Sequence, residues 1–277
     1  MMRITWEVFL FFKHSMLFFA LIAGMKKILR EWFQTVLDLL LPRTCIVCGE
    51  RLLRHERHIC LSCMADMPLT HYWKRSRNPM ADRFNELIQN QITPEKREHY
   101  AFASALFFYK SDGIYREIPH QLKYHGNTEI GSYFGKMLGR KLAAEMLWRD
   151  VDLVIPVPLH RLRQWKRGYN QAEVIASAIA SSLGTEMRTD ILKRRKRTRT
   201  QTRLNVEEKA RNVAGAFEVT GNACDTFKGR TDIRHVLIVD DVFTTGSTLF
   251  ACFTALRTVF PPSVRISVAT LGFVGGA

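Results

Sequence analysis

The sequence predicts an α/β protein with a Rossmann-like domain on a parallel sheet, preceded by a small module that holds four cysteines. Short β-branched runs such as DLVIPVP and HVLIVD alternate with amphipathic segments, which is typical of strands joined by right-handed helical crossovers. Two CxxC pairs stand close together near the amino terminus. With 277 residues, 47% of them hydrophobic, the chain can bury one large core and a small satellite.

Residues 1–24 form an apolar leader that is interrupted by Glu7, Lys13 and His14. A membrane-spanning helix needs about 20 nearly uninterrupted apolar residues, so this leader is a poor candidate for one. We favour an overextended start, with Met25 as the sensible beginning, over a membrane-associated leader. No stable membrane insertion is expected.

Residues 25–70 are expected to contain an amphipathic helix over Lys26–Leu41 and then a metal module. Cys45 and Cys48 form one tight pair, and Cys60 and Cys63 form the second. Four thiolates at this spacing predict a closed, tetrahedral, structural zinc site. Two alternatives stay open, namely disulfides in an exported chain and substitution of a cysteine ligand by His55 or His58. The remaining cysteines, Cys224 and Cys252, are expected to be small apolar residues.

Residues 71–99 are interpreted as a polar linker that includes a helix, and residues 100–277 as the main domain. Its expected elements are, in order, a strand in AFASALFFY, two helices within 113–147 that separate at Gly126-Asn127, a strand from Asp152, a helix over Asn170–Leu183, a basic segment, the strand HVLIVD, a helix over Ser247–Phe260 and the strand VRISVATLGF.

The segment VLIVDDVFTTGSTL holds the candidate site. Asp240 and Asp241 come at the carboxyl end of a buried strand, where ligands of open α/β sheets bind. The turn that follows, Thr244, Thr245, Gly246, Ser247 and Thr248, offers amides and hydroxyls to a phosphate at a helix amino terminus. Ser247 or Thr248 is expected to be the N-cap. The carboxylates would repel a bare phosphate, so they are expected to accept hydrogen bonds from ribose hydroxyls or to help hold Mg²⁺.

An ordinary strand-turn-helix with solvated carboxylates is the alternative for this segment. The segment resembles the phosphoribosyl pyrophosphate (PRPP) motif of type I phosphoribosyltransferases, in which hydrophobic residues, two acidic residues and a TTG[ST]T turn grip ribose 5-phosphate. The rest of the chain, from about Lys26 to Gly272, resembles the ComF family of competence-associated proteins. The supporting pieces are LKYHG, IPVPLHRLRQWKRGYNQA and the spaced set Arg194, Thr198, Gln201, Leu204, Arg211, Asn212, Gly215 and Phe217.

The resemblance implies a fold of the type I phosphoribosyltransferase kind, and a pyrophosphate subsite in the basic loop after Pro156-Val157-Pro158. It assigns Lys166, Arg167, Gly168, Asn170 and Gln171 to that subsite. A solvated basic turn is the alternative. The basic run 188–211 is interpreted as a lid that closes over PRPP or as a contact to single-stranded DNA, two roles that do not exclude each other. A solvated, poorly ordered face is the alternative. The formal charge of +15 suits anionic partners without choosing among them.

By resemblance we expect a cytoplasmic protein that binds PRPP with Mg²⁺, transfers phosphoribose with release of pyrophosphate, and is linked to DNA uptake in natural competence. The alternative is a non-catalytic module that binds single-stranded DNA and is regulated by PRPP. The sequence indicates neither a catalytic base nor the acceptor nucleophile.

Overall fold

The computed structural model describes residues 42–90, 98–124, 126–195, 215–227, 230 and 232–275. The chain divides into two compact units, and the boundary falls between Met64 and Ala65. The leader 1–24, the helix expected over 26–41 and most of the basic run lie outside the described residues. Within the part of the chain that is described, no helix has the length and apolar character needed to cross a membrane.

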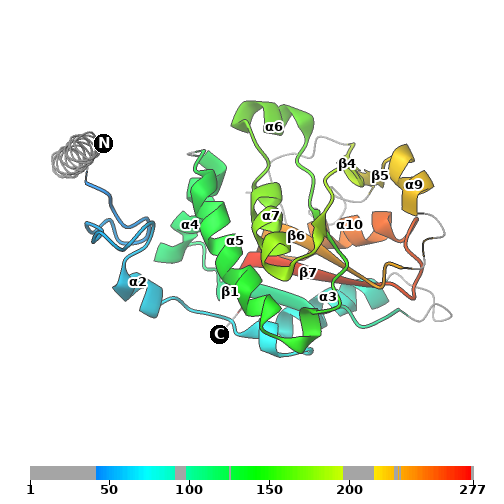
Figure 1. Ribbon diagram of the computed structural model, residues 1–277, viewed down its shortest axis with the longest axis horizontal. Coiled ribbons are helices and arrows are strands. Elements are labelled where there is room, and N and C mark those ends of the chain that lie inside the picture. Colours follow the sequence, from blue (N-terminus) through cyan, green and yellow to red (C-terminus); the bar gives the residue numbers. More distant parts are fainter. Residues whose placement is uncertain are drawn as a thin grey trace, which may run out of the picture. The chain divides into compact units, whose positions relative to one another are not determined.

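The second unit is built on a parallel sheet of five strands in the order β1-β7-β6-β2-β3. The strands are β1 (Ala103–Phe108), β7 (Arg265–Phe273), β6 (His235–Phe243), β2 (Leu153–Pro156) and β3 (Glu186–Met187). All four pairings between neighbours are parallel. The predicted α/β fold is therefore confirmed, with the acid-bearing strand β6 at the centre of the sheet (Figure 1).

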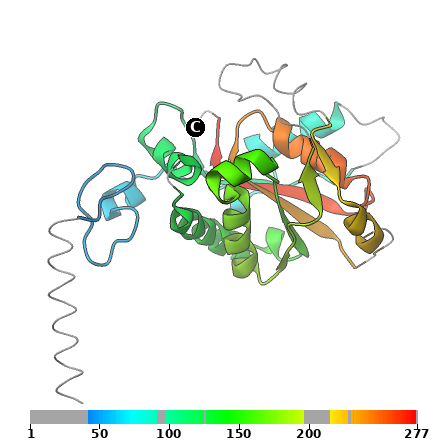
Figure 2. The ribbon, with the colours of Figure 1, turned by 90° about the horizontal axis from the view of Figure 1, so that it is seen from above.

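Helices cover both faces of the sheet, as Figure 2 shows. One face carries α5 (Thr128–Ala143) and α7 (Gln171–Leu183), and the other carries α3 (Pro79–Gln89) and α10 (Ser247–Leu256). Because the sheet is covered on both sides, β6 reads as a continuous apolar run, and Val236–Val239 are completely buried. Shorter elements between these are η2 (Ile114–Arg116), α4 (Glu117–Tyr124), η3 (Met146–Trp148) and α6 (Arg161–Arg167).

The close packing of α5 on α7 depends on glycines spaced four residues apart, Gly131, Gly135 and Gly139. A Cβ added at Gly135 would lie 3.0 Å from the carbonyl oxygen of Ile175 in α7. The helices can therefore approach backbone to backbone. This contact fixes α7, whose amino terminus faces the candidate site.

Residues 71–99, interpreted from the sequence as a linker, include η1 (Tyr72–Lys74) and α3. These elements are part of the core of the second unit, because Tyr72, Met80 and Phe84 are buried in it. The Asn78 side chain caps α3 by accepting a hydrogen bond from the Ala81 amide at 2.9 Å. The segment is thus polar in composition but amphipathic in three dimensions.

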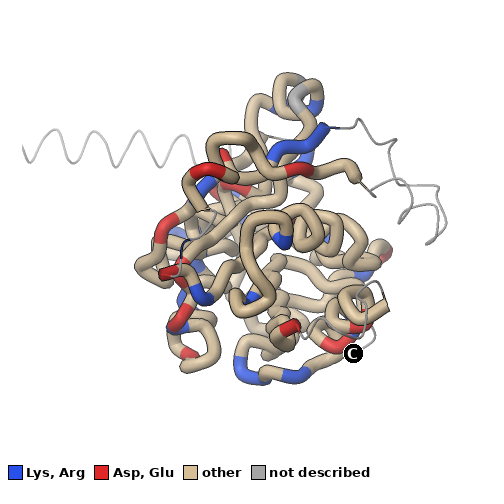
Figure 3. Tube along the Cα trace, turned by 90° about the vertical axis from the view of Figure 1, so that its right-hand side faces the viewer, with Lys and Arg blue, Asp and Glu red and all other residues tan. Residues whose placement is uncertain are grey.

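A two-stranded antiparallel ribbon stands apart from the main sheet, formed by β4 (Leu192–Arg194) and β5 (Phe217–Val219). Three consecutive basic residues, Lys193–Arg195, end at the break in the described chain (Figure 3). The α9 helix (Gly221–Phe227) follows β5.

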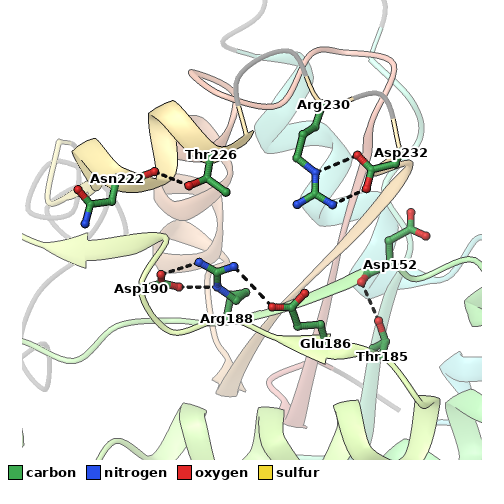
Figure 4. A network of polar contacts seen from close by, with 9 residues as sticks. All are labelled: Asp152, Thr185, Glu186, Arg188, Asp190, Asn222, Thr226, Arg230 and Asp232. Carbon is green, nitrogen blue, oxygen red and sulfur yellow. Dashed lines mark hydrogen bonds and ion pairs between the residues drawn. The ribbon is translucent and has the colours of Figure 1, made fainter.

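Paired charges lie next to the edge strand β3 (Figure 4). Arg188 forms a two-pronged pair with Asp190 at 2.8 and 2.7 Å, and Arg230 pairs in the same way with Asp232. Both guanidinium groups also lie over the ring of Phe227, at 5.4 and 5.2 Å from its centroid. Charged side chains beside a very short edge strand discourage pairing with another chain.

Candidate functional site

The site begins where β6 ends and α10 starts. The turn between them contains Gly246 in a left-handed conformation (φ 82°), and α10 begins at Ser247. The prediction that Ser247 or Thr248 is the N-cap is wrong, because Gly246 occupies that position and has no side chain to cap the helix. Instead, the Thr245 hydroxyl contacts both the amide of Ser247 (3.4 Å) and its hydroxyl (2.9 Å).

The two carboxylates at this end of β6 are held in different ways. Asp240 accepts a hydrogen bond through Oδ1 from the amide of Asp241 at 2.8 Å. Asp241 accepts one through Oδ1 from the amide of Val242 at 2.9 Å, and its Oδ2 lies 2.6 Å from the ammonium of Lys123 in α4. Each carboxylate is therefore fixed by its own backbone, and one of them is also paired with a cation.

The second side of the site comes from the segment between β2 and α7. The basic residues here are predicted from the sequence to form a loop, but residues 161–167 form the helix α6, which ends at Gly168 (φ 81°). Asn170 is 3% exposed and acts as the N-cap of α7, since its Oδ1 accepts from the Ala172 amide at 3.2 Å. Its Nδ2 donates to the Val157 carbonyl at 3.0 Å, so Asn170 ties β2 to α7.

A cavity of about 610 Å³ joins these two sides. From the predicted phosphate loop it is lined by Asp240, Asp241, Thr244, Thr245 and Thr248, and from the predicted pyrophosphate subsite by Arg167, Asn170 and Gln171. Gly246, Ser247 and Gly168 belong to the adjoining backbone and are not among the lining residues, and the side chain of Lys166 lies outside the described part. Two sequence segments predicted separately thus meet at one cavity. The individual ligand contacts stay predictions.

Charges of both signs shape the electrostatics of this cavity. Burial raises the pKa of Asp240 to about 7, and the neighbouring Asp241 carboxylate adds to the increase, against the lowering effect of Lys123 and Arg194. Burial lowers the pKa of Lys123, but Asp241 and Asp240 outweigh it, so the net shift is upward and Lys123 is a cation. Asp240 is therefore a weaker acid than an exposed aspartate, and the cations beside it limit the increase in its pKa.

The first unit carries the predicted metal ligands. The sulfur atoms of Cys45, Cys48, Cys60 and Cys63 all lie within 4.8 Å of one another, and Cys48 and Cys60 are 3.7 Å apart. A tetrahedral zinc with Zn–S bonds of about 2.3 Å gives S···S edges of about 3.8 Å, so the donor set fits zinc. All four thiols are free of disulfides. The four-cysteine cluster is thus consistent with structural zinc.

Backbone amides and one buried acid support this cluster. The amides of Cys60 and Cys63 point at the sulfurs of Cys45 and Cys60, both at 3.4 Å. Burial raises the pKa of Cys45, but backbone hydrogen bonds lower it by more, to about 7. Glu56 accepts from the amides of Leu53 (2.6 Å) and Leu61 (2.7 Å), which links the two halves of the module.

Comparison with known proteins agrees with both parts. Residues 36–73 match the model of the double zinc ribbon domain, and residues 170–271 match that of the phosphoribosyl transferase domain. The chain is 36% identical to competence protein F of Haemophilus influenzae over 115 residues, which are 42% of this chain and 48% of that protein. Both matches agree with the resemblance to the ComF family. The suspected resemblance is confirmed.

Further relatives extend the comparison. DNA utilization protein YhgH of Escherichia coli K12 is 31% identical over 136 residues, 47% of this chain and 55% of that protein. Competence protein ComFC of Bacillus subtilis is 22% identical over 208 residues, 75% of each chain. The matched region spans about half the length of the first two relatives named.

The structure adds residues to the site that were not predicted from the sequence. Lys123, Arg163 and Arg194 line the cavity, as do Arg83 and Tyr109. Lys123 and Arg194 fall within pieces that carry the family resemblance, so a signal for them exists in the sequence. Arg83 lies on α3, in the segment interpreted as a linker, and no sequence pattern points to it.

Proposed function

We propose that this protein binds PRPP together with Mg²⁺ and transfers its phosphoribosyl group to an acceptor with release of pyrophosphate. The observation that carries the proposal is the composition of the cavity. Two carboxylates and three threonines from the β6–α10 segment share it with five cationic side chains, Arg83, Lys123, Arg163, Arg167 and Arg194. A sugar that bears phosphates at two positions suits a cavity that offers carboxylates to hydroxyl groups and cations to phosphates.

Each part of the cavity has a distinct role in this proposal. The Thr244–Thr248 turn and the amino terminus of α10 hold the 5′-phosphate. Asp240 accepts hydrogen bonds from ribose hydroxyls, and Mg²⁺ enters with the pyrophosphate oxygens, which are hard ligands that suit it. The cations on the other side neutralise charge as the bond from C1 to pyrophosphate breaks. Positioning and charge stabilisation therefore supply most of the rate.

Calorimetric titration of PRPP with and without Mg²⁺, followed by an assay of pyrophosphate release with candidate acceptors, tests the proposal. The double variant Asp240→Asn, Asp241→Asn is expected to abolish release. Binding of PRPP that is unchanged in this variant would show that the carboxylates do not face the sugar. Lys136, exposed on α5, supplies a control variant, Lys136→Met.

The four-cysteine module is proposed to hold zinc as a structural ion. No coordination position is left for a substrate, so the metal would fold the module rather than take part in chemistry. Zinc content should approach one ion per chain. A chelator should raise hydrogen exchange in residues 45–63 and leave that of β6 and β7 unchanged. Retained protection in 45–63 after complete removal of zinc contradicts this role.

A second candidate function is binding of single-stranded DNA, and one relative is named a DNA utilization protein. The observation that favours it here is Trp165, which is 87% exposed on α6 while Arg163 and Arg167 of the same helix line the cavity. An exposed aromatic ring beside cations suits stacking of unpaired bases, worth about 1–3 kcal/mol per base. Titration with oligothymidylate should quench tryptophan fluorescence in the wild type and bind more weakly to Trp165→Ala. A steep salt dependence without any release of pyrophosphate would favour this function over transfer.

A further inference from the structure

Lys123 lines the cavity but belongs neither to the turn Thr244–Thr248 nor to the α6 segment. It is the last lysine of α4, and its Nζ lies 2.6 Å from Oδ2 of Asp241. Its side chain is 34% exposed and lines the same cavity as Arg163 and Arg167. An ammonium group has three N–H donors. The pair with Asp241 uses one direction, which leaves others for a ligand in the cavity.

The two carboxylates beside Lys123 are not equivalent. Both oxygens of Asp241 are engaged, Oδ1 by the Val242 amide at 2.9 Å and Oδ2 by Lys123. The hydrogen bond that the Asp240 side chain makes within the described residues uses Oδ1 and the Asp241 amide. Asp240 therefore keeps its other oxygen outside that hydrogen bond and lines the cavity, whereas Asp241 is held by the lysine.

The backbone next to Lys123 is tied to the α6–α7 side of the cavity. The carbonyl of Leu122 accepts hydrogen bonds from the Tyr169 hydroxyl and from Nε2 of Gln171, the second at 3.4 Å. Leu122 is completely buried. The end of α4 is thus anchored to the segment that carries Arg167, and Lys123 lines the same cavity as Arg167 while its ammonium group is held by Asp241.

We propose that Lys123 binds the pyrophosphate group of the ligand and that Asp241 is a positioning residue, which holds the lysine there rather than binding the sugar itself. This inference rests on the proposed function, because it assumes a ligand with phosphates at two positions. It assigns the acids different roles: Asp240 faces the ribose hydroxyls, and Asp241 acts through Lys123.

Three probes separate these roles: PRPP with Mg²⁺, inorganic pyrophosphate with Mg²⁺, and ribose 5-phosphate, each titrated by calorimetry. Lys123→Met should weaken PRPP and pyrophosphate by about tenfold to a hundredfold, as expected for a lost charged hydrogen bond, and leave ribose 5-phosphate unchanged. Asp240→Asn should weaken PRPP and ribose 5-phosphate but not pyrophosphate. Lys136→Met is the matched control, and Lys123→Gln replaces Lys123→Met if that variant does not fold.

A double-variant cycle tests the link between Lys123 and Asp241. If Asp241 acts through the lysine, Asp241→Asn weakens pyrophosphate in the wild type but has no further effect in Lys123→Met. Equal pyrophosphate binding in Lys123→Met and wild type, or an equal loss for ribose 5-phosphate, overturns the inference, since the second result indicates a merely structural lysine. Wild-type protein that binds pyrophosphate through Lys123 but not PRPP would refute the proposed function and leave only the contact between Lys123 and pyrophosphate. Wild-type protein that binds none of the three probes refutes both.

Discussion

Gly246→Ala is expected to destabilise the protein because two separate costs meet at this position. Gly246 has φ of 82°, where an alanine costs about 1–2 kcal/mol. A Cβ would also lie 2.6 Å from Cζ of Phe243 and 2.9 Å from Cδ1 of Leu87. Overpacking of a core typically costs about 1–3 kcal/mol. The expected loss of unfolding free energy is therefore about 2–5 kcal/mol.

Gly184 supplies a control that isolates the backbone cost. It ends α7 with φ of 69°, and a Cβ there would meet nothing within 4 Å. Gly184→Ala should therefore cost only the backbone component of about 1–2 kcal/mol. The difference in the free energy of unfolding between the two variants measures how tightly Phe243 and Leu87 enclose the turn Thr244–Thr248.

Urea unfolding monitored by tryptophan fluorescence provides the measurement, because Trp73 and Trp148 are buried in the second unit. Calorimetry on the folded fraction of Gly246→Ala should also show weaker PRPP binding, since the Cβ pushes the turn away from α3. Equal losses of stability for Gly246→Ala and Gly184→Ala would refute the reasoning, because the aromatic contact would then contribute nothing.

Three further predictions concern parts of the molecule away from the turn. Burial lowers the pKa of His235, with partial opposition from a neighbouring carboxylate. Below about pH 6.5 the unfolded chain therefore binds a proton at this histidine that the folded chain does not bind. The free energy of unfolding should fall there by up to about 1.4 kcal/mol per pH unit. Urea titrations at several pH values should show a smaller slope for His235→Gln. Gly135→Ala should lower the free energy of unfolding by about 1–3 kcal/mol, because the added Cβ would lie 3.0 Å from a backbone carbonyl oxygen of α7. Gly221→Ala is the control, since a Cβ there would meet no atom within 4 Å and should cause no such loss. Glu56→Gln should speed the loss of zinc to a colorimetric chelator, since an amide cannot accept both of the backbone hydrogen bonds that the Glu56 carboxylate accepts. An equal rate of zinc loss from the exposed control Glu50→Gln would contradict this prediction.

The sequence was sufficient to predict the elements whose apolar residues follow a regular local pattern. The apolar run of β6 and the helix spacing of α7 each identify their element, and Asn170 is at the amino terminus of α7 as expected. The turn between β6 and α10 could also be located, because its acids and hydroxyl residues are contiguous, whereas its binding of phosphate stays a prediction. These predictions needed only local pattern and the rule that parallel strands place ligands at their carboxyl ends.

The features that could not be predicted from the sequence depend on contacts between residues far apart in the chain. The two residues of β3 are too few to show a pattern, and α3 looks polar in sequence although Phe84 and Met80 are buried. The pair between Lys123 and Asp241 joins α4 to β6, and no spacing rule relates them. The N-cap of α10 was misjudged because hydroxyl residues favour such positions in general, whereas the tight turn here requires the positive φ of glycine.

The opposite end of β6 shows why residue types alone do not define a site. His235 lies 2.8 Å from both Asp150 Oδ1 and Ser267 Oγ, the order of groups found in acyl-transfer triads. His235 and Ser267 are completely buried, and the serine oxygen accepts the Phe102 amide at 3.1 Å. A nucleophile must reach its substrate, and this serine cannot, so the array joins β1, β6 and β7 instead. At the carboxyl end the same strand presents its acids to a cavity of about 610 Å³. Accessibility, rather than the list of side chains, therefore favours the cavity beside Asp240 as the candidate site.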